Sequence, residues 1–128
     1  MLSVRTVLKP SSIHGLGVFA EEPITKGQRV WEAEHLLDVI LTPRELERLP
    51  QVAQDYIRHH GHTAKNLMGM ILVDFGNGKY MNHSDNPNTD FRTETGYALC
   101  DIAAGEEMTC NYAEYEADDI SFHTFYKP

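Results

Sequence analysis

The stretch Lys79-Tyr80-Met81-Asn82-His83-Ser84-Asp85-Asn86-Pro87-Asn88 is a dense polar segment between two runs that are typical of β-strands. Asn82 carries an amide donor and an acceptor, His83 two ring nitrogens, and Ser84 a hydroxyl. Pro87 fixes one backbone angle and disfavours a helix. These groups are suited to holding a small polar ligand. For Asn-His-Ser taken alone, however, a hairpin loop stiffened by side-chain to backbone hydrogen bonds is the favoured interpretation.

Two other segments change this balance. They are His14-Gly15-Leu16-Gly17-Val18-Phe19-Ala20 upstream and Gly105-Glu106-Glu107-Met108-Thr109-Cys110-Asn111-Tyr112 downstream. In this order and at these separations, the three segments resemble the signature of the SET-domain protein-lysine methyltransferases. The resemblance implies that family's mainly β fold, also called the β-clip: several small curved sheets, one helical insert (hence α+β), and a C-terminal pseudoknot. The sequence pattern alone indicates only short strands and one capped helix.

The resemblance implies a binding site for S-adenosylmethionine. Glycines at 15 and 17 carry no Cβ, so the backbone can come close to a ligand there, although alone they indicate only a turn. By resemblance this main chain lies against the methionine end of the cofactor. The Asn82 amide is expected to point toward the amino-acid portion, and the His83 main chain toward the adenine edge. The expected cofactor contacts are His14, Gly15, Leu16, Gly17, Asn82 and His83.

The resemblance also makes Tyr112 the expected catalytic residue, with a hydroxyl that orients the lysine amine and offers an oxygen to the methyl group. Without that context, Tyr112 is a buried tyrosine that satisfies one hydrogen bond. Burial of a lysine in an apolar channel beside a positive sulfur favours the neutral amine, so no strong base is needed. Tyr56, Phe125 and Tyr126 are candidate residues of the substrate channel. Packing in the core explains Tyr56 better, and a core or dimer contact explains the other two nearly as well.

Three positions depart from the family's pattern. Asp85 stands where cysteine is common, Met108 replaces leucine, and Asn111 stands where aspartate precedes the tyrosine. The leucine to methionine change conserves volume. The departures at Asp85 and Asn111 leave open a second hypothesis, a module that binds the cofactor or a lysine-bearing peptide without turnover; an interaction scaffold is a third. Since Tyr112 is retained, a protein-lysine N-methyltransferase is the favoured function.

Length and composition limit the other possibilities. The 128 residues suit one domain over 1–128, and no apolar run suggests a signal peptide or a membrane span, so a cytoplasmic protein is expected. The formal net charge of -8 disfavours direct nucleic-acid binding. It suits a basic protein substrate, although ordinary solubility explains an acidic surface about as well. No metal site is expected. The chain has only two cysteines, and the histidines at 59, 60 and 62 are interpreted as exposed side chains near a helix end. A second copy of so small a domain could complete the groove, so a homodimer is one expected state.

The helical insert is the clearest local signal, at about 42–61. Thr42 is expected as N-cap, Pro43 at the first helical position, and Glu45 as the partner in a capping box. Pro50 should kink or split the helix, and Gly61 should end it. Leu36 to Leu41 is expected as a mostly buried strand. The aromatic tail at about 113–128 is expected to cover the cofactor in place of the cysteine-rich zinc tail of other family members.

Overall fold

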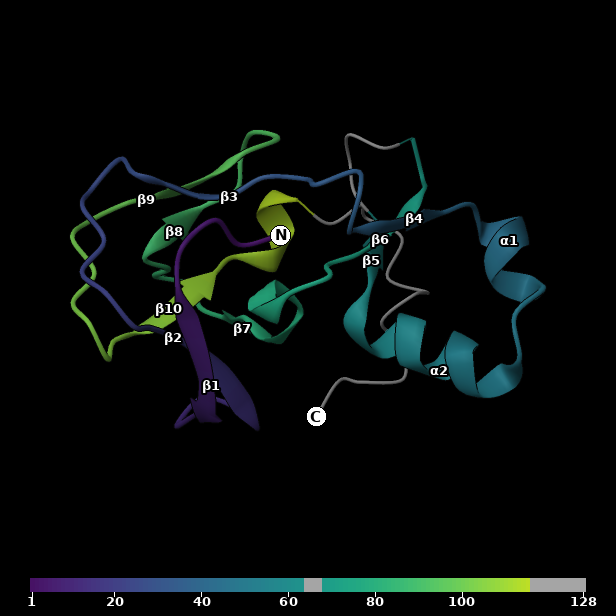
Figure 1. The fold of residues 1–128 in the computed structure, drawn as a ribbon, viewed down its shortest axis with the longest axis horizontal. Helices are drawn as coiled ribbons and strands as arrows, with labels where there is room; N and C mark the ends of the chain where they lie inside the picture. The colour runs from purple at the N-terminus through teal and green to yellow at the C-terminus, as the bar shows by residue number, and fades with distance from the viewer. Residues whose placement is uncertain (64–67, 116–128) are drawn as a thin grey trace.

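The computed structural model describes residues 1–63 and 68–115, and within them the strands form three small sheets (Figure 1). The largest sheet has the order β1-β2-β10-β7, with β1 at Thr6–Pro10, β2 at Leu16–Ala20, β10 at Glu107–Cys110 and β7 at Asn82–His83. The second has the order β3-β9-β8, with β3 at Arg29–Trp31, β9 at Gly96–Ala98 and β8 at Thr89–Asp90. The third has the order β4-β6-β5, with β4 at Val39–Leu41, β6 at Ile71–Val73 and β5 at His62–Thr63. The predicted fold of several small sheets is confirmed.

Strand β10 lies in the middle of the largest sheet, although it comes last among the strands of the described residues. It pairs antiparallel with β2, where Met108 lies opposite Val18, and parallel with β7, where Thr109 lies opposite Asn82. The side chains of Met108 and Val18 are fully buried in the main hydrophobic core. This C-terminal strand is inserted between two earlier segments, as the pseudoknot prediction requires, and it brings the three motifs to one sheet.

The helical insert consists of two helices, α1 at Pro43–Glu47 and α2 at Gln51–His60. They are separated at Pro50, which is the N-cap of α2, and Gly61 is its C-cap, so the predicted split and end are confirmed. The helices contribute Leu46 and Ile57 to a second, smaller core with Ile71 and Val73 of β6. Figure 1 shows the two helices beside β4, β5 and β6, at the opposite end of the molecule from the sheet of β3, β9 and β8.

The predicted capping box at the start of α1 is present. The Glu45 amide donates to Thr42 Oγ1 at 3.2 Å, and the Thr42 amide donates to Glu45 Oε2 at 2.8 Å. Replacement of Thr42 by alanine is expected to lower the free energy of unfolding by about 1 kcal/mol, because one of the amide donors at the helix start loses its acceptor. Chemical denaturation measures this change. Replacement of the exposed Thr93 in the 91–95 loop should change it by less than about 0.5 kcal/mol, and an equal loss in both variants would contradict the capping argument.

The prediction that Leu36 to Leu41 forms a mostly buried strand is wrong. The strand β4 is restricted to Val39–Leu41, and Leu36 and Val39 are 81% and 46% exposed. The buried residue of this segment is Asp38, whose carboxylate accepts the amides of Glu34 at 2.7 Å and Phe75 at 2.8 Å. Because Asp38 points inward, its apolar neighbours are turned toward solvent.

The hydrogen bonds of Asp38 therefore connect the β3–β4 segment to the end of β6, and we call this contact region the Asp38 junction. Asp38 Oδ2 also accepts the amino group of Met1 at 2.8 Å. Next to it, Asp74 Oδ2 accepts the indole N–H of Trp31 at 2.6 Å. Burial alone would raise the pKa of Asp38, but the hydrogen bonds from Glu34, Met1 and Phe75 outweigh that effect and hold the pKa below its ordinary value of 3.8.

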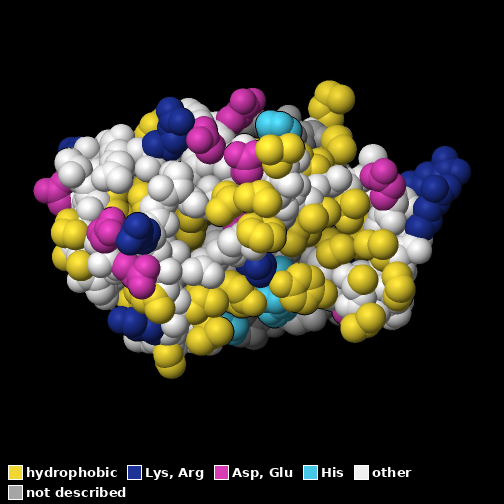
Figure 2. All heavy atoms as spheres, in the orientation of Figure 1, with side chains coloured by type: hydrophobic (Ala, Val, Ile, Leu, Met, Phe, Trp, Pro, Cys, Tyr) yellow, Lys and Arg dark blue, Asp and Glu magenta, His cyan; other side chains and the backbone are white. Residues whose placement is uncertain are grey.

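Part of the surface of the described residues is hydrophobic. Figure 2 shows hydrophobic side chains exposed across one face, and the exposed large hydrophobic residues include Leu36, Leu37, Val39, Val52 and Phe75. No helix in the described ranges is both long and apolar enough to pass through a membrane.

Candidate functional site

Asn82 joins the polar segment to the glycine-containing loop. It is buried, and its Nδ2 donates to the main-chain oxygens of His14 at 3.0 Å and Leu16 at 3.2 Å and to Glu107 Oε1 at 2.9 Å. Three acceptors around one atom identify that atom as the nitrogen of the amide, which fixes the orientation of the group. Segments from all three sequence motifs therefore meet at one side chain.

The loop before β2 is closed on itself. The Ser11 amide donates to the Gly15 oxygen at 2.8 Å, and Gly15 adopts a φ of +46°, which a residue with a side chain rarely takes. The Ser11 hydroxyl donates to both oxygens of Glu107 at 2.8 and 2.9 Å, and it accepts the Ile13 amide at 2.9 Å. A Cβ at Gly17 would overlap Glu107 Oε1, so only glycine leaves room for that carboxylate.

The oxygen of the Asn82 amide has a different environment from its nitrogen. No donor among residues 1–63 and 68–115 bonds to Asn82 Oδ1, although the nitrogen of the same amide has three acceptors. The orientation of the amide is set by the protein, while its oxygen retains the capacity to accept a hydrogen bond. This oxygen can therefore receive an N–H donor from a ligand.

Tyr112 lies at the end of β10, close to the same motif. Its hydroxyl donates to the main-chain oxygen of Met81 at 2.7 Å, and its amide donates to His83 Nδ1 at 3.2 Å. Asn111 begins the short 3-10 turn Tyr112–Glu114, and its side-chain oxygen accepts the Ala113 amide at 3.0 Å. The departure at Asn111 thus keeps a capping acceptor that holds the turn carrying Tyr112.

The side chain of His83 has a structural part in this arrangement. Because Nδ1 accepts the Tyr112 amide, that nitrogen carries no proton, and the Nε2 proton is directed at Asp85 Oδ1 at 3.1 Å. Asp85, which also departs from the family's pattern, therefore contacts His83 from an exposed position. One ring nitrogen of His83 therefore supports the main chain of Tyr112, and the other contacts Asp85.

The structure does not bring Tyr56 to the other predicted residues through any contact within the described part of the chain. Its side chain is 48% exposed, so the core interpretation of this residue is wrong. Its ring contacts His60 of α2 at 4.5 Å between centroids, and His60 contacts Tyr80 at 5.1 Å. Phe125, Tyr126 and nearly all of the predicted aromatic tail lie outside the described residues.

The histidines at the end of α2 are not equally exposed, contrary to expectation. His59 is exposed, whereas His60 is half-buried between the two tyrosine rings. Burial lowers the pKa of His60, and the positive charges of His59 and Lys79 lower it further. Among the residues that the structure describes, no three histidine, cysteine or acidic side chains are arranged to hold a metal ion.

Three contributors to this site were missed in the sequence. They are the carboxylate of Glu107, the hydroxyl of Ser11 and the main-chain oxygen of Met81. The Gly-Glu-Glu motif did contain a signal for Glu107, since successive residues of an extended chain point to opposite faces and only one of the two neighbouring glutamates can face the loop. The Met81 oxygen had no signal, because every residue carries a carbonyl group.

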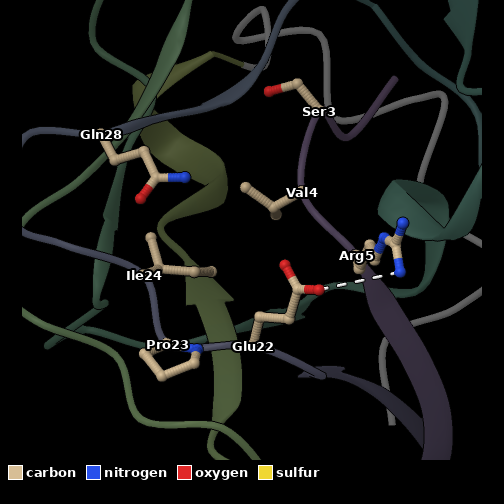
Figure 3. A pocket seen from close by; sticks show the side chains of 7 residues that line it. All are labelled: Ser3, Val4, Arg5, Glu22, Pro23, Ile24 and Gln28. Carbon is tan, nitrogen blue, oxygen red and sulfur yellow. Dashed lines mark ion pairs between the residues drawn. The ribbon is translucent and has the colours of Figure 1, made fainter.

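A hollow of about 210 Å³ lies elsewhere, between the chain before β1 and the chain before β3. Figure 3 shows its lining, in which Arg5 and Glu22 form an ion pair at 3.7 Å between exposed side chains. The residues around it are Ser3, Val4, Arg5, Glu22, Pro23, Ile24 and Gln28, none of which belongs to the three motifs. The contacts of Asn82, Glu107 and Tyr112 therefore locate the candidate site, and this hollow is separate from it.

Known proteins were compared with the chain. The sequence model of the SET domain matches residues 15–113. A Plasmodium falciparum protein assigned as a histone methyltransferase is similar in structure, with 24% identity, a TM-score of 0.59, and coverage of 87% of this chain and 95% of that one. At this identity the likeness is one of fold alone. A comparison with curated protein sequences gives no match.

Two structures of the Chaetomium thermophilum Polycomb Repressive Complex 2, both bound to an inhibitor, are also similar. A humanized mutant has 26% identity and a TM-score of 0.62 over 92% of this chain, and a second structure has 25% identity and a TM-score of 0.63 over 90%. Each match covers 16% of the Polycomb chain, so this chain spans about a sixth of its length.

Proposed function

Because the chain belongs to the SET-domain family, we propose that it is a protein-lysine N-methyltransferase that uses S-adenosylmethionine. One observation carries the proposal: the Tyr112 hydroxyl donates to the Met81 oxygen at 2.7 Å across 31 positions of sequence. This bond holds a phenol next to Asn82, at the end of the parallel pair of β7 and β10. The match of the SET-domain model to residues 15–113 supports the same activity.

The described residues fit the cofactor. The Asn82 oxygen can accept a hydrogen bond from its ammonium group, and the Glu107 carboxylate provides negative charge beside the same loop. The main chain of His14, Gly15, Leu16 and Gly17 would hold the methionine end, and the main chain of His83 the adenine edge. When bound, S-adenosylmethionine supplies a reactive methyl group on a positively charged sulfur.

Tyr112 would orient the amine of the substrate. A lysine side chain has a pKa of about 10.4 in water, so a site that excludes water must favour its neutral form. The Tyr112 hydroxyl uses its single hydrogen on Met81, and a hydroxyl oxygen in that state still accepts. It would therefore accept an N–H from the neutral amine and direct the nitrogen lone pair away from itself, toward the methyl group.

A basic protein is the proposed substrate. The formal net charge of -8 favours basic partners over nucleic acids, and one structure of the similar Polycomb complex contains histone H3 forms. A histone would place the reaction at chromatin, whereas the sequence led us to expect the cytoplasm. The single domain over 1–128, the homodimer and the covering of the cofactor by the 113–128 tail remain predictions.

Incubation with labelled S-adenosylmethionine and a panel of basic proteins, histones included, tests the proposal. We expect label in at least one protein and a methylated lysine by mass spectrometry. Isothermal titration calorimetry on the same preparation gives the cofactor affinity independently. Cofactor binding without transfer to any protein would favour the non-catalytic binding module, and the absence of both would contradict the proposed function.

A further inference from the structure

We propose that Glu107 is a positioning residue that clamps the cofactor loop, residues 11–17, against β7. The inference rests on the proposed function and adds a residue to its site. Glu107 is the shared acceptor of the two side chains that hold this loop, Ser11 at its start and Asn82 behind it. Without Glu107, the two side chains would have no common partner.

The clamp acts on both sides of the loop. On one side, the Ser11 hydroxyl gives its hydrogen to Glu107, which leaves its oxygen turned to accept the Ile13 amide at 2.9 Å. On the other side, Asn82 gives one hydrogen bond to Glu107 while it also holds the oxygens of His14 and Leu16. Every donor in this network has an acceptor, which makes the loop conformation specific.

The charge of Glu107 strengthens the clamp. Hydrogen bonds to a carboxylate are shorter and stronger than those between neutral groups, and the three bonds here measure 2.8 to 2.9 Å. In the described part of the chain, Glu107 has no ion pair with a lysine, arginine or histidine. Its charge is therefore balanced only by neutral donors, and it remains available to attract a cationic cofactor.

Glu106 provides a matched control. It is the preceding residue of the same motif, it is exposed, and its Oε2 accepts the Ala103 amide at 2.9 Å in the turn before β10. Within residues 1–63 and 68–115, none of the hydrogen bonds of Glu106 involves the loop. Replacement of Glu106 removes a negative charge one position away but leaves the clamp intact. The comparison therefore distinguishes the effect of the Glu107 contacts from the effect of losing one negative charge in this motif.

The test measures S-adenosylmethionine binding by calorimetry for Glu107→Gln, Glu107→Ala and Glu106→Ala. Glutamine keeps an acceptor oxygen but loses the charge, so the cofactor Kd should rise about threefold; alanine removes the clamp and should raise it about thirtyfold. Glu106→Ala should leave it unchanged. The KM for the protein substrate should stay within about twofold in all three variants, which a general loss of folding would not allow.

Hydrogen exchange of the ligand-free protein tests the clamp without the cofactor. The amides of Ile13 and His14 should exchange faster in Glu107→Ala than in Glu106→Ala, and Ser11→Ala should give the same local effect. In the double variant of Ser11 and Glu107 the increases in Kd should not multiply, because both residues act through one contact.

The outcomes distinguish this inference from the proposed function. If the unaltered chain binds the cofactor and Glu107→Ala binds it equally well, the clamp is wrong while the enzyme proposal stands. If Glu107→Ala weakens binding of cofactor and protein substrate alike, the residue is a general structural one and the clamp is again overturned. If the unaltered chain binds no cofactor, the proposed function fails, whatever the exchange data give for the loop.

Discussion

Replacement of Tyr112 by phenylalanine is expected to lower the rate of methyl transfer by a factor of about one hundred to one thousand, while the cofactor affinity stays within about twofold. The hydroxyl is the group that would orient the amine, and loss of one aligned hydrogen-bonding group in an active site has effects of this size. The contacts of Asn82 and Glu107 do not involve this hydroxyl, so cofactor binding should persist. Single-turnover kinetics at saturating cofactor measure the change.

Tyr97 is a suitable control for this experiment. It lies on β9 in another sheet and is 38% exposed, so Tyr97→Phe should transfer methyl groups at the unaltered rate. Tyr112→Phe also loses the bond to Met81, which should lower the free energy of unfolding by about 1 kcal/mol. Thermal unfolding measures that loss separately. A Tyr112→Phe variant that stays folded and transfers at the normal rate would remove the main support of the enzyme proposal.

Replacement of Asp38 by alanine is expected to have the largest effect on stability, a loss of about 3 kcal/mol. The buried carboxylate accepts two main-chain amides and the Met1 amino group, and its removal leaves these donors without a partner inside the protein. Urea denaturation followed by tryptophan fluorescence is a suitable measurement, because Trp31 lies beside this junction. Replacement of the exposed Asp101 should change the free energy of unfolding by less than about 0.5 kcal/mol.

The contribution of Asp38 should also depend on pH. Its pKa in the folded protein is below the ordinary value of 3.8, so the folded state favours the ionised form. The stabilisation is complete above the unfolded pKa and is lost as the pH falls through the lower, folded value. The difference between the unaltered chain and Asp38→Ala should therefore be constant near neutrality and shrink below about pH 4. A difference that grows with acidity would contradict this assignment.

Local chemistry made the helical insert predictable. Thr42, Pro43 and Glu45 act on one another within a single turn, so the start of α1 could be predicted without knowledge of the rest of the chain. Pro50 likewise separates the helices through its own backbone. The exposure of Leu36 and Val39 could not be predicted, because it depends on Asp38 contacting the amide of Phe75, which is 37 residues away.

The candidate site was predictable only through the resemblance. Nothing local in the sequence indicates that β10 pairs with both β2 and β7, and that pairing is what brings Tyr112 to Met81 and Glu107 to Asn82. Asn82 was expected to point its amide at the cofactor. Its nitrogen instead donates to the loop, so only the oxygen is left to contact the cofactor. The different roles of the two amide atoms follow from contacts that sequence motifs do not encode.

The central place of β10 has a consequence for biosynthesis. During translation the ribosome would release the hairpin of β1 and β2 and the polar segment around β7 long before the strand that joins them. Pairings between segments so distant along a chain are slow to form, since the entropy of closing a long loop must be overcome first. The largest sheet of a nascent chain would thus remain incomplete until residues 107–110 emerge. Molecular chaperones would have their greatest influence in that interval.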